Sequence, residues 1–334
     1  MRIFLTLLSI IVLMACETRP GPVKNQKVGN ALGTTYSIIY LSEEPLELQQ
    51  QIDSIFRVVN QSMSTYMPQS DISLINKGDT TVVVDTMFKE VFEISSKVHK
   101  ATNGYFDPTV GILVNAWGFG PGKQISMDST EIDSLMHFVG WEKVGLHSNG
   151  TVMKQHPEIQ FDFNAVAKGY AIDRIGALLD SKNVSDYLIE VGGEVLTSGE
   201  NRITNKKWTV GIDDPQVTEG RALKLIIYLK DKALASSGNY RKYRVDPDTG
   251  EKFVHTIDSK TGYTKNSKVL AASVIAGNCA TADAYATAFM AMELEDSKNI
   301  LQSKRELDAY IIYLDDAGTT QEFMTEGFKV LVAQ

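Results

Sequence analysis

Apolar side chains recur three and four residues apart in several stretches of the chain, which predicts amphipathic helices. The predicted helices cover 52–63, 86–101, 128–140, 165–179 and 281–292. Ser42 is the expected N-cap of the first helix, while Asp128 and Glu131 are expected to form a capping box for the third. Gly140 is expected to end the third helix, because glycine readily adopts the conformation of a helix C-cap.

Strand patterns dominate the second half of the chain. β-branched and alternating runs, separated by Gly, Asp and Asn turns, predict strands at 187–195, 208–212, 222–229, 253–258, 269–276, 310–314 and 328–332. An earlier β-rich run covers 28–41 and contains a glycine turn at Gly33. Helices cluster early and strands late without regular βαβ alternation, so we expect an α+β fold with mixed or antiparallel sheets and flanking helices. No linker divides 28–334, which is therefore expected to be a single domain.

The first residues form a separate pattern. Arg2 precedes an apolar run of about twelve residues, which is too short to span a bilayer but fits the core of a signal peptide. The run ends in Leu13-Met14-Ala15-Cys16, which resembles a lipobox, in which the cysteine is diacylated. We therefore expect a signal peptide at 1–15, a lipidated Cys16 and a tether at 16–27. An ordinary secretory signal that happens to contain a cysteine is the alternative.

Composition and charge indicate a globular protein and argue against several other classes of protein. The 334 residues are 43% hydrophobic and 22% charged, which is typical of a globular protein. A net charge of -8 argues against the basic face of a nucleic-acid binder. Two cysteines exclude a disulfide framework, and the chain has no CxxC or Cys/His cluster of a zinc site. If Cys16 is lipidated, Cys279 is expected to be a free, buried thiol.

The segment 278–289 combines a carboxylate and a hydroxyl on an alanine-rich helix. Asp283 and Thr287 are four residues apart and share one helix face. Their oxygens are hard donors suited to Mg²⁺ or Ca²⁺, and the helix N-terminus suits anionic phosphates. The alanines leave room for a ligand or for another backbone. From spacing alone, a tightly packed alanine helix remains an alternative.

Two further segments carry groups for phosphate and proton chemistry. In 162–173, Lys168 lies near the start of a helix, where an ammonium can meet a phosphate, and Gly169 permits close approach. In 255–263, His255 is followed by an Asp/Gly turn and could act as a general base for a hydroxyl. A solvent-facing lysine and a histidine bonded to its own turn are the respective alternatives.

Aromatic residues beside glycines offer surfaces for a flat ligand. Tyr66, Trp117 and Phe119 can stack on a heteroaromatic ring, although such residues also commonly belong to a core. The glycine-rich segment 118–123 is not a P-loop, because Trp117 stands where the first glycine is needed and Gln124 replaces the Ser or Thr.

Taken together, these segments resemble the ApbE family of FAD:protein FMN transferases. The matching motifs occur in family order: LGTTY (32–36), MSTYMPQSDISLIN (63–76), TNGYFDPTVGILVNAWGFGP (102–121), DFNAVAKGYAID (162–173), EVGGEV (190–195), SSGNY (236–240), HTIDSKTG (255–262) and ATADAYATAF (280–289). They cover nearly everything between Leu32 and Met292. The resemblance implies an ApbE-like, T-fold-related architecture of two interlocked lobes.

The resemblance also implies an activity. FAD would be the donor substrate, its FMN part would pass through a phosphodiester bond to a Thr or Ser of an acceptor flavoprotein, such as an Rnf- or Nqr-type subunit, and AMP would leave. Mg²⁺, or Ca²⁺ in its place, would be the cofactor. Nucleic acid is not an expected partner. The lipobox agrees with many lipoprotein members, so we expect an exported protein anchored by its lipid on the periplasmic side of the inner membrane.

Site residues follow from the same resemblance, motif by motif. The metal ligands would be Asp283, Thr287 and the backbone oxygen of Ala165, and Lys168 would lie near the phosphates. His255, Asp283 and Lys168 would carry the catalysis. The FAD site would be lined by Leu32, Tyr66, Trp117, Gly118, Phe119, Asp162, Lys168 and Ile257. Two departures from the family pattern are Leu32 in place of Met and Ser259 in place of Pro.

Two other functions fit the same motifs. A metal-dependent FAD pyrophosphatase would use water in place of the acceptor hydroxyl and release FMN and AMP. A non-catalytic lipoprotein would bind FAD without turning it over. Analysis of the products in the absence of acceptor separates the first from the transferase, and measurable turnover that falls in Asp283→Ala excludes the second.

Overall fold

The computed structural model describes residues 21–217, 220, 222–239, 243–245, 252–265 and 267–333. The predicted signal peptide and Cys16 lie outside these residues, as does Tyr240 of the SSGNY motif. None of the helices in the described part of the chain has the length and hydropathy of a membrane-spanning segment.

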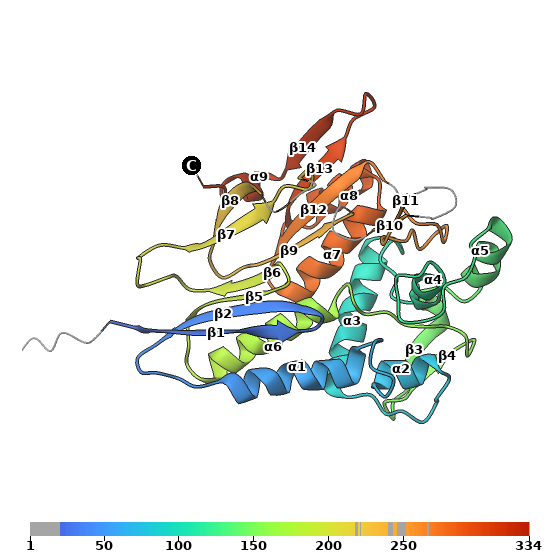
Figure 1. The fold of residues 1–334 in the computed structure, drawn as a ribbon, viewed down its shortest axis with the longest axis horizontal. Helices are drawn as coiled ribbons and strands as arrows, with labels where there is room; N and C mark the ends of the chain where they lie inside the picture. Colours follow the sequence, from blue (N-terminus) through green and yellow to red (C-terminus); the bar gives the residue numbers. More distant parts are fainter. Residues whose placement is uncertain are drawn as a thin grey trace, which may run out of the picture.

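An eight-stranded sheet runs through the molecule (Figure 1), and every neighbouring pair of its strands is antiparallel. In spatial order the strands are β1 (Val23–Ala31), β2 (Thr34–Ser42), β5 (Asp186–Val191), β6 (Glu194–Ser198), β9 (Ala233–Gly238), β12 (Val269–Ala276), β13 (Asp308–Leu314) and β14 (Thr320–Met324). The sheet and its helices confirm the predicted α+β class with an antiparallel sheet.

Both faces of the sheet are covered, because side chains alternate between two cores along each central strand. In β13, Ala309 and Ile311 join the core beneath the helices, whereas Tyr310 and Ile312 join the core on the opposite face. The longer helices of the first core are α1 (Gln49–Met63), α3 (Thr86–Ala101), α6 (Ala167–Ser181) and α7 (Cys279–Ala291). The second face is covered by β7 (Trp208–Asp213), β8 (Leu223–Leu229) and α9 (Glu326–Lys329). The central helices α6 and α7 are therefore held directly on the sheet.

A third, smaller core lies beside the first and contains Leu113, Trp117, Phe119, Ile132 and Ile257. Its helices are α4 (Gly111–Ala116) and α5 (Ser129–Met136), seen at the right of Figure 1. The remaining elements are α2 (Asp71–Asn76), a 3₁₀ turn (Trp141–Lys143), β3 (Val144–Leu146), β4 (Val152–Lys154), β10 (Tyr243–Val245), β11 (Lys252–Val254) and α8 (Leu294–Ser303). The segment that carries His255 begins next to this smaller core.

All five predicted helices form, but two of their predicted ends are wrong. The range of α3 is as predicted, and Asp128 caps α5 by accepting from the amides of Thr130 and Glu131. Ser42 is not a helix cap, because it ends β2 and its hydroxyl donates to the carbonyl of Glu44. The third helix ends at Met136 rather than Gly140, whose amide donates to the hydroxyl of Thr109.

Three strand predictions need correction. The run 187–195 is two strands, because Gly192 and Gly193 adopt positive φ and turn the chain between β5 and β6. The strand predicted at 253–258 stops at Val254. The strand predicted at 328–332 begins instead as helix α9, capped by Thr325, and the last sheet strand is the more polar β14.

The N-terminal boundary of the folded part also differs from the prediction. β1 begins at Val23 and pairs with β2 along its whole length, so 23–27 belong to the sheet and not to the predicted tether. The strand was not apparent because β1 is an edge strand of mostly polar residues. Cys279 is a free, buried cysteine, as expected.

Candidate active site

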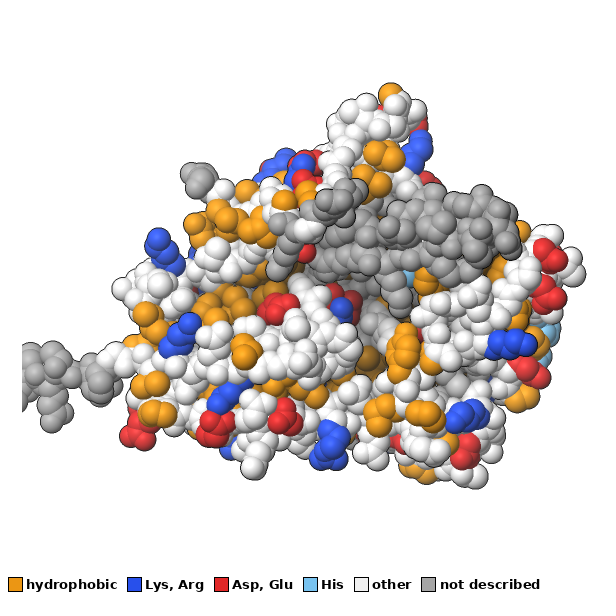
Figure 2. Space-filling model, in the orientation of Figure 1, with side chains coloured by type: hydrophobic (Ala, Val, Ile, Leu, Met, Phe, Trp, Pro, Cys, Tyr) orange, Lys and Arg blue, Asp and Glu red, His pale blue; other side chains and the backbone are white. Residues whose placement is uncertain are grey.

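A cavity of about 290 Å³ opens between the sheet with its helices and the smaller core. Figure 2 shows this face of the molecule hollowed near its centre. Nine of the residues singled out from the sequence line the cavity: Tyr66, Phe119, Asp162, Ala165, Lys168, His255, Ile257, Asp283 and Thr287. The structure thus brings together residues that are spread over more than two hundred positions of the chain.

The crossing of α6 and α7 builds one wall of this cavity. At Gly169 the two helices approach so closely that a Cβ atom would lie 2.4 Å from the carbonyl oxygen of Cys279. This contact lets Asp283 Oδ2 accept a hydrogen bond from the amide of Gly169 at 3.2 Å. Glycine is needed here because backbone, unlike a flexible side chain, cannot move aside for a methyl group.

The N-terminus of α7 is occupied by acceptors from the protein itself. Asp173 accepts from the amides of Cys279 and Ala280 at 2.7 and 2.9 Å, and Asn278 caps the helix by accepting from Thr281. The expectation that this helix N-terminus receives phosphates is therefore wrong, because these first amides already have partners. Any phosphate contact on this wall has to come from groups other than these amides.

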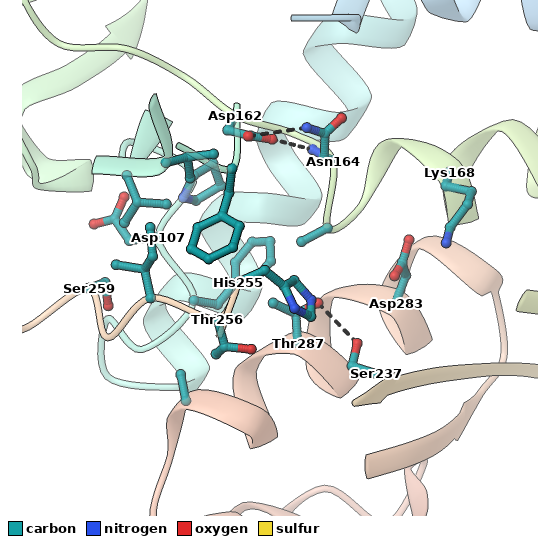
Figure 3. Close-up of a pocket in the computed structure, with 18 of the residues that line it drawn as sticks. Asp107, Asp162, Asn164, Lys168, Ser237, His255, Thr256, Ser259, Asp283 and Thr287 are labelled. Atoms are coloured by element: carbon teal, nitrogen blue, oxygen red, sulfur yellow. Dashed lines mark hydrogen bonds between the residues drawn. The ribbon is translucent and has the colours of Figure 1, made fainter. Parts of the chain in front are cut away.

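A buried cluster of three charged side chains lies on the same wall. Lys168 Nζ is 2.6 Å from Glu194 Oε2, and Lys168 points toward Asp283 in Figure 3. Burial raises the pKa of Glu194 to about 7 and also raises the pKa of Asp283, while Lys168 opposes both shifts. Burial alone would lower the pKa of Lys168, but Glu194 and Asp283 outweigh it and raise that pKa. One ammonium thus faces two carboxylates, and the cluster can accept a further positive charge.

Oxygen donors continue from this cluster along the cavity. Asp283 and Thr287 are one turn apart on α7, and both line the cavity, as the spacing predicted. The hydroxyl of Thr287 lies 3.4 Å from the hydroxyl of Ser237 at the end of β9. Ala165 lies in the turn that leads into α6. The donor set fits a small hard cation, which commonly takes one carboxylate, neutral oxygens, water and substrate phosphate.

No group of three or more His, Cys, Asp or Glu side chains that could hold a metal ion occurs among the described residues. The set predicted from the sequence contains only one such side chain, Asp283, and relies on a hydroxyl and a backbone oxygen for the rest. Such a set depends on the substrate to complete the coordination of an ion.

Three of the predicted site residues do not line the cavity. The indole of Trp117 is 4% exposed, packs in the smaller core and donates from Nε1 to the carbonyl of Gly262 at 2.9 Å. Gly118 has φ +80, and a Cβ there would meet the side chain of Gln124. Leu32 lies at φ +52 in the turn between β1 and β2. The stacking surface predicted at Trp117 is therefore wrong, because the ring is already enclosed by protein.

Sequence reasoning missed several residues of the cavity wall. Glu194, Ser237 and Thr256 line the cavity but were not singled out as site residues. The signal for Glu194 was a charged residue in an apolar strand directly after Gly192-Gly193, since a buried charge needs a partner. Ser237 and Thr256 carry no comparable signal, because hydroxyl side chains are frequent in strands and turns.

Known proteins resemble this chain over nearly its whole length. The model of the ApbE family matches residues 32–311. The FAD:protein FMN transferase of Haemophilus influenzae is 33% identical over 92% of this chain and 90% of its own length. That of Vibrio cholerae is 32% identical over 98% of each chain.

Solved structures agree with these sequence relatives. The flavin transferase ApbE from Vibrio cholerae covers 93% of this chain and 99% of its own, with a TM-score of 0.82 and 30% identity. The ApbE protein from Thermotoga maritima has a TM-score of 0.81 at 26% identity and covers 93% of this chain. Together with the ordered motifs and the shared fold, these matches show that the chain belongs to the ApbE family.

Proposed function

We propose that the cavity beside α7 is where this chain moves the FMN part of FAD to a Thr or Ser hydroxyl of an acceptor flavoprotein. The chain is an FAD:protein FMN transferase, because relatives with this activity match it over most of its length. One observation carries the assignment to this cavity: the family motifs, far apart in the sequence, converge on it with Asp283, Thr287 and Lys168 along one wall.

The reaction breaks the phosphoanhydride bond between the FMN and AMP parts of FAD and forms a phosphoester bond to the acceptor oxygen. The acceptor oxygen attacks the phosphorus of the FMN part, the bond from that phosphorus to the bridging oxygen breaks, and the bridging oxygen leaves with AMP. The hydroxyl proton has to be removed as the new P–O bond forms. Charge that develops on the phosphate oxygens and the leaving AMP must be balanced by positive groups in the cavity.

Lys168 and the α7 oxygens are suited to that charge balance. Held by Glu194, the ammonium of Lys168 is directed into the cavity, where it would contact the diphosphate. Asp283, Thr287 and the backbone oxygen of Ala165 would hold Mg²⁺, or Ca²⁺ in a looser geometry. When bound, such an ion neutralises phosphoryl oxygens and orients them for attack.

His255 is our candidate for the general base. It lines the same cavity as Asp283 and Thr287, and all three are labelled in Figure 3. An imidazole at this place would take the proton of the acceptor hydroxyl. The remaining part of the cavity, with Tyr66, Phe119 and Ile257, offers aromatic and apolar surface for the flavin.

The two parts of the structure that flank the cavity support the predicted two-lobed architecture. The sheet with α6 and α7 supplies the phosphate side, and the smaller core with α4 and α5 supplies Phe119 and Ile257.

We also propose that Cys16 carries the lipid that anchors the protein, after export, on the periplasmic side of the inner membrane. The lipobox-like sequence before Cys16 supports this. Metabolic labelling with a palmitate analogue, lost in Cys16→Ala, tests it.

The transferase assignment is tested with FAD, Mg²⁺ and an acceptor flavoprotein domain that carries the target Thr. We expect covalent flavin fluorescence on the acceptor in a denaturing gel, with one AMP released for each flavin attached. A Thr→Ala acceptor is the matched control. FMN and AMP released at the same rate with and without acceptor, and no labelled acceptor, would show a pyrophosphatase instead.

A further inference from the structure

The side of the cavity that contains the proposed general base is formed by an irregular loop, residues 255–265. We call it the His255 loop. His255, Thr256, Ile257 and Ser259 of this loop line the cavity. Apart from an isolated bridge between Ile257 and Thr264, the loop has no regular secondary structure. Its position therefore depends on individual hydrogen bonds rather than on a helix or strand.

The loop closes on itself before it contacts the rest of the protein. The amide of Asp258 donates to the carbonyl of Tyr263 at 2.9 Å, and that of Gly262 donates back to the carbonyl of Asp258 at 2.8 Å. At the base of the loop, the amide of Lys265 donates to the carbonyl of Thr256 at 2.8 Å. These bonds make the loop one unit whose two ends meet directly beside His255.

A single side chain, Asn239, connects both ends of this unit to the sheet. Thr256 is 7% exposed, and its hydroxyl donates to Asn239 Oδ1 at 2.8 Å. Asn239 Nδ2 donates to the carbonyl of Lys265 at 3.4 Å. Asn239 follows β9 directly, two positions after Ser237, whose hydroxyl lies 3.4 Å from that of Thr287. A short path of contacts thus joins the Thr287 side of the cavity to the residue next to His255.

Other contacts hold the opposite end of the loop. The hydroxyl of Ser259 donates to the carbonyls of Gly104 and Tyr105 at 2.6 and 3.2 Å, and Trp117 Nε1 donates to the carbonyl of Gly262. The indole bond ties the loop tip to the smaller core, and the Ser259 bonds tie it to the segment at Gly104 and Tyr105, where Tyr105 packs against the first core. They lie three or more positions from His255, whereas the bond between Thr256 and Asn239 is made by the adjacent residue.

We propose that Asn239 and Thr256 are a positioning pair, which sets His255 at the distance from Thr287 and Asp283 that proton removal from the acceptor hydroxyl requires. This inference rests on the proposed role of His255 as general base. Neither residue takes part in a chemical step, since both act only by fixing the position of the His255 imidazole. Small displacements of a base cost rate steeply, because proton transfer needs hydrogen-bond distance at the moment of attack.

The test compares two substitutions at one position with a control nearby. Thr256→Val keeps the shape and loses the hydroxyl, whereas Thr256→Ser keeps the hydroxyl. Ser267→Ala is the matched control, because Ser267 Oγ also bonds backbone carbonyls, those of Val269 and Met290, but does not line the cavity. Steady-state FMN transfer to an acceptor domain gives kcat and the KM for FAD for each variant.

We expect Thr256→Val to lower kcat about 10- to 100-fold while the KM for FAD changes less than about threefold. Thr256→Ser should stay within about threefold of the wild-type kcat, and Ser267→Ala should match the wild type. Adding Asn239→Ala to Thr256→Val should lower kcat little further, because the bond between the two side chains is already lost and only the longer bond from Asn239 to the carbonyl of Lys265 remains to be removed. If Thr256→Val does not fold, Asn239→Ala replaces it with the same expected loss of kcat.

A wild-type kcat in Thr256→Val, or a Thr256→Ser variant as slow as Thr256→Val, overturns the inference. Measuring His255→Ala in the same assay distinguishes failure of the positioning pair from failure of the proposal that His255 is the general base. If His255→Ala abolishes transfer while Thr256→Val leaves kcat unchanged, only the positioning pair is wrong. If His255→Ala transfers FMN at the wild-type rate, the base assignment is wrong and the inference falls with it.

Discussion

The two sides of the cavity are constructed differently. On the α6–α7 side, a backbone contact at Gly169 and a buried charge cluster hold Lys168 and Asp283 in place. On the opposite side, His255 lies on a loop that is tied down by a few side-chain hydrogen bonds. Packed helices resist displacement, whereas a loop can move when one bond is lost. Changes at the crossing of α6 and α7 should therefore affect stability and activity together, and loss of the bond next to His255 should affect mainly activity.

The largest expected effect is that of Asp283→Ala. The substitution removes the only carboxylate of the proposed cation site and leaves the amide of Gly169 without its acceptor. We expect FMN transfer to fall by more than about 1,000-fold, since both the ion and its charge neutralisation are lost. Transfer rates and the melting temperature are measured together, and both should fall. Transfer within tenfold of the wild type would contradict the assignment.

The second largest effect is expected in the pH dependence of the free energy of unfolding, to which Asp173 contributes. Burial raises the pKa of Asp173 to about 6, from an ordinary value of 3.8, despite its hydrogen bonds from Cys279 and Ala280. The native state thus binds this proton more tightly than the unfolded state, so the contribution of Asp173 to the free energy of unfolding falls as pH rises from about 4 to 6. Asp173→Asn lacks this dependence and should gain up to about 3 kcal/mol relative to the wild type between pH 4 and 7. Urea unfolding at both pH values measures the difference, and parallel profiles would contradict it.

Gly169 and Gly176 offer a matched pair on α6. A Cβ at Gly169 would meet the backbone of Cys279, whereas one at Gly176 would meet the flexible end of Leu196 at 2.7 Å. Gly169→Ala should lower the free energy of unfolding by about 1–3 kcal/mol and slow transfer, because it separates α6 from α7. Gly176→Ala should cost less and leave transfer unchanged. Denaturant unfolding and transfer rates are compared for the two variants, and equal effects would argue against the close crossing as the organising contact.

The smallest effect is expected on the loop side at Trp117. Trp117→Phe keeps an aromatic ring in the smaller core but removes the hydrogen bond to Gly262. We expect about 1 kcal/mol of lost stability and an unchanged KM for FAD. The measurements are thermal unfolding and the dependence of transfer on FAD concentration. A KM raised more than about tenfold would restore the flavin-stacking role that the buried position argues against.

The sequence predicted the helix side of the site better than the loop side, and the reason is physical. The spacing of Asp283 and Thr287 places both on one helix face wherever the helix packs, and Gly169 indicated a close approach. Helix α3 was predicted over its full range because apolar residues recur at helical spacing along most of its buried face, with only Ser95 between Val91 and Val98. Such local patterns depend on few distant contacts.

The remaining features depend on contacts between distant segments. The pairing of Lys168 with Glu194 joins a helix to a strand, and the bond between Asn239 and Thr256 joins β9 to a loop. Nothing in the local sequence of either partner specifies the other. The wrong prediction for Trp117 has the same cause. Its neighbouring glycines suggested a stacking surface, but the hydrogen bond to the distant Gly262 is not visible in the local sequence. Family resemblance supplied what local patterns could not, namely that the separate motifs share one site.

The proposed function depends above all on a divalent cation held between Asp283 and Thr287 at the diphosphate of FAD. Crystals soaked with FAD and Mn²⁺, which replaces Mg²⁺ and scatters anomalously, test this directly. We predict an anomalous peak within bonding distance of Asp283 and Thr287 and next to the phosphate oxygens, lost in Asp283→Ala. Bound FAD without a peak there, or a peak at other residues only, would contradict the account.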